Sequence, residues 1–363
     1  MKIAIDAMGG DYAPQKIVEG AVWAAKELKI PIVLVGDREK ISEELKKYHT
    51  EGLPLSIQHA SQVIGMHESP SKASRSKQDA SIVVATKLLA EGKVDGLVSA
   101  GNSGAVMTSA LRYLGRLHGI YRPAIATLIP TQKGHCVVAD AGANSDCKPE
   151  YLFQFAIMAK IVAEKILSIE NPKVGLLSIG EEKEKGNHLT KHTYPLLESF
   201  KNFQFIGNVE GRDIPRGKAD VVVCDGFVGN VILKIMEGTG DVMGKMIKAE
   251  IGASLLAKIG YFFISPAFKK FRKKVDYAEY GGAPLLGVKG ICIIAHGKSS
   301  AKAIKNAVRE ASLFASKKVN LEITQKIQEA NLHSCFQPEG NQNVAKFENE
   351  NNHSDPTFSA KSN

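Results

Sequence analysis

Cysteine is sparse in this sequence and never occurs in a paired motif. No two of the five cysteines have the C-x-x-C spacing of a zinc ribbon or a thiol redox site. They stand at Cys136, Cys147, Cys224, Cys292 and Cys335. Because an odd, scattered set of thiols suits a reducing compartment, the sequence predicts a cytoplasmic protein.

Long apolar runs are also missing. No stretch offers the roughly 20 consecutive apolar residues that a transmembrane helix needs, so we expect none. The N-terminal stretch "MKIAIDAMGG" carries Asp6 within its first apolar run. It therefore lacks the uninterrupted apolar region of a signal peptide.

Neither common nucleotide-binding fingerprint is present. After the first predicted strand the chain reads "DAMGGDYAP" and not G-x-G-x-x-G. The stretch "CIIAHGKS" comes near a Walker A loop, but Cys292 stands where the first glycine belongs. The segment Gly297-Lys298-Ser299 still lies between a predicted strand and a helix. It fits either a small-anion site or a helix cap with a solvated lysine.

The composition is that of a soluble globular protein with a basic balance. Of 363 residues, 44% are hydrophobic and 23% charged, and the formal net charge is +9. This charge favours acidic partners: nucleic acid, an anionic membrane surface, an acidic carrier protein or phosphorylated substrates. The only dense basic run is "FRKK". Because no nucleic-acid module accompanies it, we expect no nucleic-acid binding.

Strand-like and helix-like segments alternate along most of the chain. Near-continuous apolar strands separated by helices predict a three-layer αβα sandwich with a mostly parallel, Rossmann-like sheet. The predicted strands are "KIAID", "PIVLVGD", "VDGLVSA", "PAIATLIP", "HCVVADA", "KVGLLSIG", "ADVVVCD" and "KGICIIAH". We expect a single α/β domain over residues 1–333, a helical protrusion over about 238–280, and a disordered polar tail over 334–363.

Four predicted strands end in loops rich in glycine and asparagine. These loops are 101–104, 142–145, 185–187 and 226–230. Such residues are common in ordinary turns and helix caps. In open α/β sheets, however, ligands bind beyond the carboxyl ends of strands, where glycines let backbone N–H groups approach an anion. Four such loops together predict a shared phosphate or polyanion site.

Several side chains near these loops could hold or activate phosphate. Lys185 and Lys298 could neutralise its charge, and Asp225 or His296 could orient or deprotonate it. Asp225 fits a helix cap equally well, and His296 a hydrogen-bonded structural histidine. Hydrogen-bond donors are predicted at Asn102, Ser103, Asn144, Asn187 and Asn230. Earlier in the chain, Lys72, Arg75 and Lys77 in "ESPSKASRSK" form either a solvated basic face or a clamp on a phosphate or phosphopantetheine arm.

Cys224 raises a different mechanism, through a covalent acyl-enzyme. It lies at the end of the apolar run Val221–Val223, however, with no histidine nearby in the sequence. That setting favours a buried, inert thiol.

Taken together, these stretches resemble the phosphate acyltransferase family of bacterial phospholipid synthesis, the PlsX-type acyl-carrier-protein:phosphate transacylases. The matching stretches run from residue 1 to about 317: "IAIDAMGGDYAP", "ESPSKASRSK", "SAGNSGA", "DAGAN", "SIGEEKEKGN", "DGFVGNVILK", "YGGAPLLGVKG" and "AHGKS". Ser103 stands where this family is expected to have Thr.

The resemblance implies a fold, an activity and partners. The fold would be like that of phosphotransacetylases and isocitrate dehydrogenase. The enzyme would move a long fatty acyl group from acyl-carrier protein to inorganic phosphate, for use by a membrane glycerol-3-phosphate acyltransferase. It would be a cytoplasmic homodimer associated peripherally with an anionic membrane, without a metal or organic cofactor.

We assign site residues on the matching stretches. The catalytic set is Lys185, Asp225, Asn230 and His296. The substrate-binding set is Asp6, Gly9, Gly10, Arg75, Asn102, Ser103, Asn144, Asn187, Gly226, Gly229 and Lys298. The alternative function is a short-chain acyl-coenzyme A phosphotransacylase, and a more remote one is a non-enzymatic nucleic-acid-binding protein.

The segment "ASLLAKIGYFFISPAFKKFRKK" places aromatic and aliphatic residues beside a basic cluster. Its apolar part is too short to span a bilayer, so it predicts either an interfacial membrane element or a helical hairpin at a dimer interface. The predicted membrane-contact residues are Leu255, Leu256, Phe262, Phe263, Phe268, Lys269 and Lys270.

Overall fold

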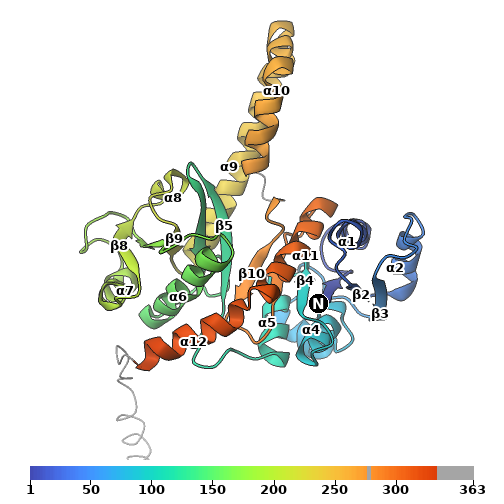
Figure 1. Ribbon diagram of the computed structural model, residues 1–363, viewed down its shortest axis with the longest axis horizontal. Coiled ribbons are helices and arrows are strands. Elements are labelled where there is room, and N and C mark those ends of the chain that lie inside the picture. Colours follow the sequence, from blue (N-terminus) through green and yellow to red (C-terminus); the bar gives the residue numbers. More distant parts are fainter. Residues whose placement is uncertain (276–278, 333–363) are drawn as a thin grey trace, which may run out of the picture.

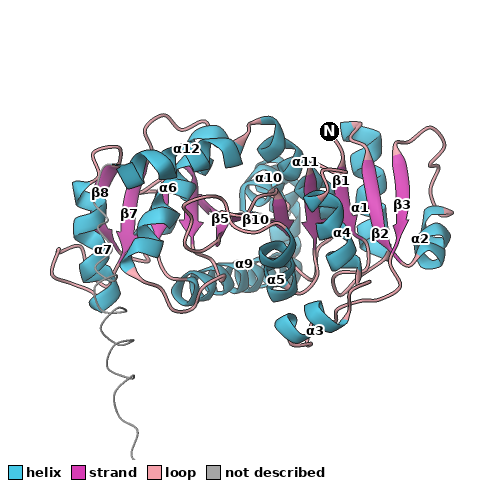
Figure 2. Cartoon of the chain, turned by 90° about the horizontal axis from the view of Figure 1, so that it is seen from below, coloured by secondary structure: helices cyan, strands magenta, loops and turns pink. Residues whose placement is uncertain are grey.

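The computed structural model describes residues 1–275 and 279–332, and one continuous sheet runs through them (Figure 1). The sheet has 11 strands in the order β3-β2-β1-β4-β11-β10-β5-β6-β9-β7-β8. Figure 2 shows the strands between helices on either side. This arrangement agrees with the predicted three-layer α/β sandwich. The predicted tail, 334–363, lies outside the described residues.

The N-terminal block of the sheet is parallel. It contains β1 (Ile3–Asp6), β2 (Ile32–Gly36), β3 (Leu55–His59), β4 (Gly96–Ser99) and β11 (Cys292–Ile294). Alternate side chains enter different cores, as a pleated strand requires. Ile3 and Ile5 belong to the core with α1 (Gln15–Leu28) and α11 (Ala301–Ser316), whereas Ala4 belongs to the core with α4 (Ser81–Ala90) and α5 (Ser103–Tyr113). Two short helices complete this block, α2 (Arg38–Leu45) and α3 (Pro70–Ser76).

The C-terminal block is a second parallel set. It contains β6 (Gly134–Ala139), β7 (Lys173–Leu177), β8 (Gln204–Val209) and β9 (Val221–Val223). On one face lie α6 (Pro149–Lys165), α7 (His188–Ser199) and α12 (Val319–Leu332). On the other face lie α8 (Asp213–Arg216) and the start of α9 (Gly226–Ala253).

Two antiparallel strands join the blocks. These are β5 (Ala124–Thr131) and β10 (Ala283–Leu286), and the pairings β11–β10, β10–β5 and β5–β6 are all antiparallel. Three reversals in a row make the two parallel blocks run in opposite directions. The prediction of a mostly parallel sheet is confirmed, but this antiparallel centre was not predicted. Because of this antiparallel centre, the carboxyl ends of the two parallel blocks lie at opposite edges of the sheet.

A helical hairpin, which we call the arm, projects from the body (Figure 1). It consists of the outer part of α9 and of α10 (Leu255–Val275). The 21 residues of α10 span about 30 Å at the usual helical rise. Within the described residues, no helix has the length and apolar character needed to cross a bilayer.

The chain that returns from the arm is fastened to both blocks. Tyr280 is hydrogen-bonded to His135 at the start of β6. Lys302 of α11 forms an ion pair with Glu279, with 2.7 Å between nitrogen and oxygen. Gly281 lies so close to α11 that a Cβ there would be 2.1 Å from the backbone nitrogen of Ala307. The base of the arm therefore has a defined position against the sheet.

Candidate functional site

The ends of β1, β4 and β11 form the first group of polar loops. Asp6 is buried at the end of β1, and Ser99 Oγ donates a hydrogen bond to its Oδ2 at 2.8 Å. A Cβ on Gly9 would lie 2.4 Å from that carboxylate oxygen and 2.8 Å from the backbone nitrogen of Gly101. Gly10 has φ +106°, and the carbonyl of Gly297 accepts a bond from the N–H of Asp11. The close approach of these backbones requires the glycines that the sequence provides.

A small pocket opens between these loops. Burial, the largest influence, raises the pKa of the Asp6 carboxyl, and hydrogen bonds from Ser81 and Ser99 oppose the rise. A carboxyl that takes up a proton more readily opposes a bound anion less. The pocket is lined by Asp6, Gly9, Val63, Ile64, Ser81, Ile82, Ser99, Gly101, Asn102 and Ala105.

The N-terminus of α5 borders this pocket. Asn102 is its N-cap: the side-chain oxygen accepts from the N–H of Ala105, and Nδ2 donates to the carbonyls of Met66 and Glu68 at 3.1 and 3.2 Å. Its amide is thus committed to holding the preceding loop, and the prediction that it donates to phosphate loses support. The first N–H groups of a helix have no partner within it. Here they belong to Ser103 and Gly104, and they are available for an anion.

The ends of β6 and β9 form the second group. Asp140 follows β6, is fully buried, and accepts five hydrogen bonds through its carboxylate. One of the five comes from Nδ2 of Asn144, which also donates to the carbonyl of Pro123. Asn144, predicted as a phosphate donor, is therefore occupied in organising its own loop.

The first turn of α9 differs from the sequence interpretation. The stretch at 226–230 was read as a turn before a helix, but α9 begins at Gly226 itself. Asp225 is its N-cap and accepts from the N–H of Val228 at 2.9 Å, as in the structural alternative for this residue. The N–H of Gly226 donates to the carbonyl of Asn144 at 2.7 Å. A Cβ on Gly229 would lie 1.8 Å from the carbonyl oxygen of Asp140. Both glycines therefore let the helix lie against the loop after β6, which leaves little of their backbone for phosphate.

Asn230 is the polar side chain of this turn that faces outward. It is exposed, and its Cβ, Cγ and Oδ1 lie 3.6–3.7 Å from the position that a Cβ on Gly142 would take. Phe227 is also exposed, at 65%. The structure thus brings Asn230 together with Gly142 and Asn144.

The two groups are linked through the loop after β6. Ala141 and Ala143 share one contiguous apolar cluster with Ala105, Val106 and Met107 of α5. The loop that carries Asn144 and the helix whose N-terminus borders the first group thus contribute to the same apolar core. We take the ends of β1, β4, β6 and β9 as one candidate site around this shared core, although the two sheet blocks run in opposite directions.

The loop after β7 makes its side-chain hydrogen bonds separately from the two groups described above. Lys185 is exposed, and its carbonyl accepts a bond from Ser178 Oγ. Asn187 caps α7 by accepting from the N–H of Thr190 at 2.9 Å. Among the described residues, no side chain of this loop is hydrogen-bonded to either group. Because β7 is paired with β9, however, its loop follows a strand that runs in the same direction beside the second group.

The remaining predicted residues lie around the first group. His296 follows β11, and its Nδ1 accepts from the N–H of Lys298 at 3.1 Å. Lys298 is exposed, and so is Arg75 on α3. The helix α3 lies against α5: a Cβ on Gly104 would be 2.6 Å from Pro70.

Cys224 has the environment of an inert thiol. It is buried, Sγ donates to the carbonyl of Asp140 at 3.6 Å, and burial raises its pKa well above the ordinary value. This favours the sequence interpretation of a buried thiol over a covalent acyl-enzyme.

Asp140 is the residue that sequence reasoning missed. It lies within the predicted strand "HCVVADA" and begins the stretch "DAGAN", but it was not assigned to the site from the sequence. The signal that could have found it is its likeness to Asp6: each is an acidic residue ending an apolar strand before a small-residue loop. Across the described parts of the chain, no group of three or more His, Cys, Asp or Glu side chains could hold a metal ion.

Comparison with known proteins places this geometry in a family. A sequence model described as "Fatty acid synthesis protein" matches residues 1–322. The chain belongs to this family. Two relatives, both named phosphate acyltransferase, match almost end to end. The one from Geobacter sulfurreducens is 53% identical over 328 residues, covering 90% of this chain and 94% of the relative. The one from Dictyoglomus turgidum is 54% identical over 330 residues, covering 91% and 97%.

Solved structures agree on the fold. A phosphotransacetylase from Streptococcus pyogenes has a TM-score of 0.56 at 18% identity, covering 88% of this chain and 94% of that one. The EutD phosphotransacetylase from Staphylococcus aureus has a TM-score of 0.51 at 16% identity, covering 90% and 94%. At such identities the likeness concerns the fold alone. The resemblance to phosphate acyltransferases and the phosphotransacetylase-like fold expected from the sequence are both confirmed.

Proposed function

We propose that this protein transfers a long-chain fatty acyl group from acyl-carrier protein to inorganic phosphate. The observation that carries the proposal is the match to phosphate acyltransferases at 53% identity over 90% of the chain. The candidate site supports it, because backbone N–H groups and polar side chains converge there without a nucleotide-binding fingerprint.

The reaction needs only positioned groups and no cofactor. A phosphate oxygen attacks the thioester carbonyl carbon, the carbon–sulfur bond breaks, and the proton of hydrogen phosphate ends on the thiol. Acyl phosphate and free carrier thiol are the products. Positioning can supply roughly 7–11 kcal/mol of the barrier, and N–H donors stabilise the developing oxyanion.

Roles follow from exposure and location. The free N–H groups at the start of α5, with Gly9 and Gly10, are the proposed phosphate cradle, and Lys298 and Arg75 are the nearby cations. Asn230 is the proposed oxyanion donor because its side chain faces outward. Lys185 is the proposed charge partner from the neighbouring loop, and His296 the group that orients phosphate. Asp225 and Asn187 act here as helix caps.

A thioester-consumption assay tests the proposal. Long-chain acyl-carrier protein and the matching acyl-coenzyme A would be compared, each with and without inorganic phosphate. We expect phosphate-dependent release of carrier-protein thiol. Turnover that is unchanged when phosphate is omitted would reject the transacylase. A clear preference for short-chain acyl-coenzyme A would instead support the alternative that the phosphotransacetylase-like fold suggests.

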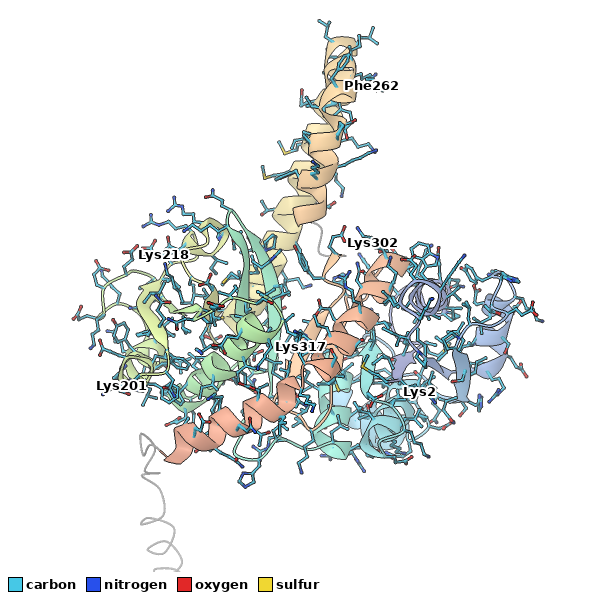
Figure 3. The ribbon with its side chains drawn as sticks, viewed as in Figure 1. Lys2, Lys201, Lys218, Phe262, Lys302 and Lys317 are labelled. Atoms are coloured by element: carbon cyan, nitrogen blue, oxygen red, sulfur yellow. The ribbon has the colours of Figure 1, made fainter. Side chains whose placement is uncertain are left out.

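The arm supports two further proposals, membrane contact and dimer formation. Leu255, Leu256, Phe262 and Phe263 are 74–81% exposed at or near its tip (Figure 3). Lys269 and Lys270 are exposed on the same helix, whereas Phe268 is half-buried against Tyr261. An exposed apolar tip beside cations fits an anionic membrane surface. We therefore propose a cytoplasmic protein that binds the membrane peripherally and delivers acyl phosphate to a membrane glycerol-3-phosphate acyltransferase.

The outer part of α9 is the proposed homodimer surface. Gly238, Gly240 and Gly244 each cost helix stability, yet a Cβ at any of them would meet no atom within 4 Å. Met243 and Met246 on the same stretch are 57% and 63% exposed. A second copy of the helix would cover these methionines and use the space above the glycines.

A further inference from the structure

We propose that Asp140 is a positioning residue that holds Asn230 and the loop 142–144 in one arrangement for acyl transfer. This inference rests on the proposed function. It concerns a residue that touches neither phosphate nor thioester and acts through its neighbours.

The carboxylate of Asp140 gathers donors from two segments. Its Oδ1 accepts from the N–H groups of Ile125, Gly142 and Ala143 at 3.0, 3.1 and 3.0 Å. Its Oδ2 accepts from the N–H and Nδ2 of Asn144 at 2.7 and 2.9 Å. Five hydrogen bonds on one buried carboxylate fix the loop 142–144 against β5 with little freedom to move.

The backbone of Asp140 holds a third segment. Its N–H donates to the carbonyl of Cys224 at 2.9 Å, and its carbonyl accepts from the Cys224 thiol. The same carbonyl lies directly under Gly229, in the first turn of α9. The turn that carries Asn230 therefore rests on Asp140, while Gly226 donates to Asn144 in the loop that the carboxylate holds.

Two independent attachments thus converge on the place where Asn230 meets Gly142. One passes from the carboxylate to the loop, and the other from the carbonyl to the helix. A shift of either would move the Asn230 amide relative to the loop. Because a displacement of about 1 Å can cost on the order of 100-fold in rate, a residue that prevents it affects turnover without touching substrate.

Substitution by asparagine tests the carboxylate alone. The change Asp140→Asn keeps shape and burial but replaces one acceptor oxygen with an NH₂ group. In either orientation, that NH₂ group faces at least two N–H donors. Burial raises the pKa of this carboxyl, and its hydrogen bonds oppose the rise. The variant removes at least two of those hydrogen bonds, because an NH₂ group cannot accept from an N–H donor.

The matched control is Asp220→Asn. Asp220 is a half-buried aspartate at the amino end of β9, and its Oδ2 accepts from the N–H of Lys173 at 2.8 Å. It belongs to the same sheet block but lies at the opposite end of the strands. It controls for the loss of a structural carboxylate in this block.

The experiment is a double-mutant cycle with Asn230→Ala in the phosphate-dependent thioester assay. We expect Asp140→Asn to lower kcat by about 10- to 100-fold, with KM for phosphate changed less than about threefold. Asn230→Ala should add little to it, because both changes remove the same contribution. Asp220→Asn should keep kcat within about twofold, because this substitution is remote from the reacting atoms and leaves their surroundings unchanged.

Three results would overturn the assignment: a wild-type kcat in Asp140→Asn, fully additive losses in the cycle, or a wild-type kcat in Asn230→Ala. If Asp140→Asn fails to fold, Asn144→Ala removes one of the five bonds and takes its place in the cycle, with the same expectation of non-additive losses. A wild-type enzyme that needs no phosphate would reject the proposed function itself, which separates that failure from this one.

Discussion

Glu310 places a carboxyl group in an otherwise apolar space beneath the central strands. Its neighbours include Leu128 of β5, Val162 and Ile166 of α6, and Phe314 of α11. Burial raises the pKa of this carboxyl to about 7, which the adjacent Arg309 only partly opposes. The folded chain therefore holds this proton more tightly than the unfolded chain does.

This buried acid predicts a loss of stability as pH rises. Above the ordinary pKa of 4.5 the unfolded chain ionises freely, and the folded chain must bury a charge or keep the proton. The cost grows between pH about 4.5 and 7 and is complete above that, at about 3 kcal/mol as an upper bound. We expect Glu310→Gln to be more stable than the wild type at pH 8 but not at pH 4.5, measured by urea unfolding. An exposed control, Glu39→Gln, should leave the pH profile unchanged. If the stabilities of Glu310→Gln and wild type changed with pH in the same way, the prediction would be wrong.

Cys224 carries a second prediction for a single side chain. Its thiol is buried and bonded to the Asp140 carbonyl, so it is neither ionised nor accessible to a thioester. We expect Cys224→Ala to retain most phosphate-dependent turnover, within about threefold. Intact-mass analysis of wild type during turnover should show no acyl adduct. An adduct mapped to Cys224 would restore the covalent mechanism.

At the scale of the element, α9 joins two environments within one helix. Its first turn lies on the carbonyl of Asp140, while the glycines of its outer part have open space above them. The same residue type therefore has opposite effects at its two ends. Gly229 permits contact that no larger residue could make, and Gly238 has open space above it.

A pair of alanine variants tests that contrast. Gly229→Ala would place a methyl group 1.8 Å from the Asp140 oxygen, so we expect it to lose several kcal/mol of stability, about 3 kcal/mol. At a protein concentration at which the chain is monomeric, Gly238→Ala adds a methyl group in open space and should gain about 0.5–1 kcal/mol from helix propensity. Chemical denaturation measures both. Equal stabilities for the two variants would mean that the first turn of α9 does not rest on this carbonyl.

The tip of the arm predicts a membrane interaction that can be removed. We expect Phe262→Glu with Phe263→Glu to abolish sedimentation with anionic liposomes, because two charges would enter the apolar boundary. Soluble turnover and the dimer should persist. Ile179→Glu with Leu321→Glu is the control, since both residues are exposed away from the arm, at 81% and 55%. Continued sedimentation of the arm variant, or its dissociation into monomers, would make the tip an assembly element instead.

The sequence allowed prediction of strands with two buried faces but not of the others. The strands β1, β4 and β9 are buried at every position, and the apolar runs that contain them identified them. The edge strand β3 has no buried residue, and the edge strand β8 is buried only at its last two residues; neither was predicted. The strand β10 contains Pro284 and pairs in the antiparallel sense, which no local pattern indicates.

The site was predictable as a set of loops and not as a set of contacts. Glycines and asparagines after strands marked the right places. Whether an asparagine donates to a ligand or to its own loop depends on distant partners, however. Asn102 bonds residues 36 and 34 positions away, and Asp140 reaches Ile125 across 15. Such pairings arise only when the sheet assembles, so Asp140 remained unassigned.

For the whole molecule, phosphate binding should increase the stability of the folded chain. A ligand that binds only the folded chain at 100 times its Kd adds about 2.7 kcal/mol. We expect inorganic phosphate to raise Tm by several degrees, about 5 °C, whereas sodium chloride of equal ionic strength should not. A Tm that does not respond to phosphate at any concentration up to the solubility limit would argue against a preformed phosphate site.

The order of the strands also governs how the chain acquires its shape during synthesis. In the N-terminal block, β4 is flanked by β11, whose Cys292 pairs with Leu97, and the core around Ile3 and Ile5 is closed by α11. When only the first half of the chain has been synthesised, one apolar face of the N-terminal block is therefore exposed, because the helix α11 that covers it has not yet been made. The C-terminal block has β6–β9 within residues 134–223 and can pair its strands earlier. The part of the protein that is translated first is thus completed late, and the nascent N-terminal block is the stretch on which a chaperone would act.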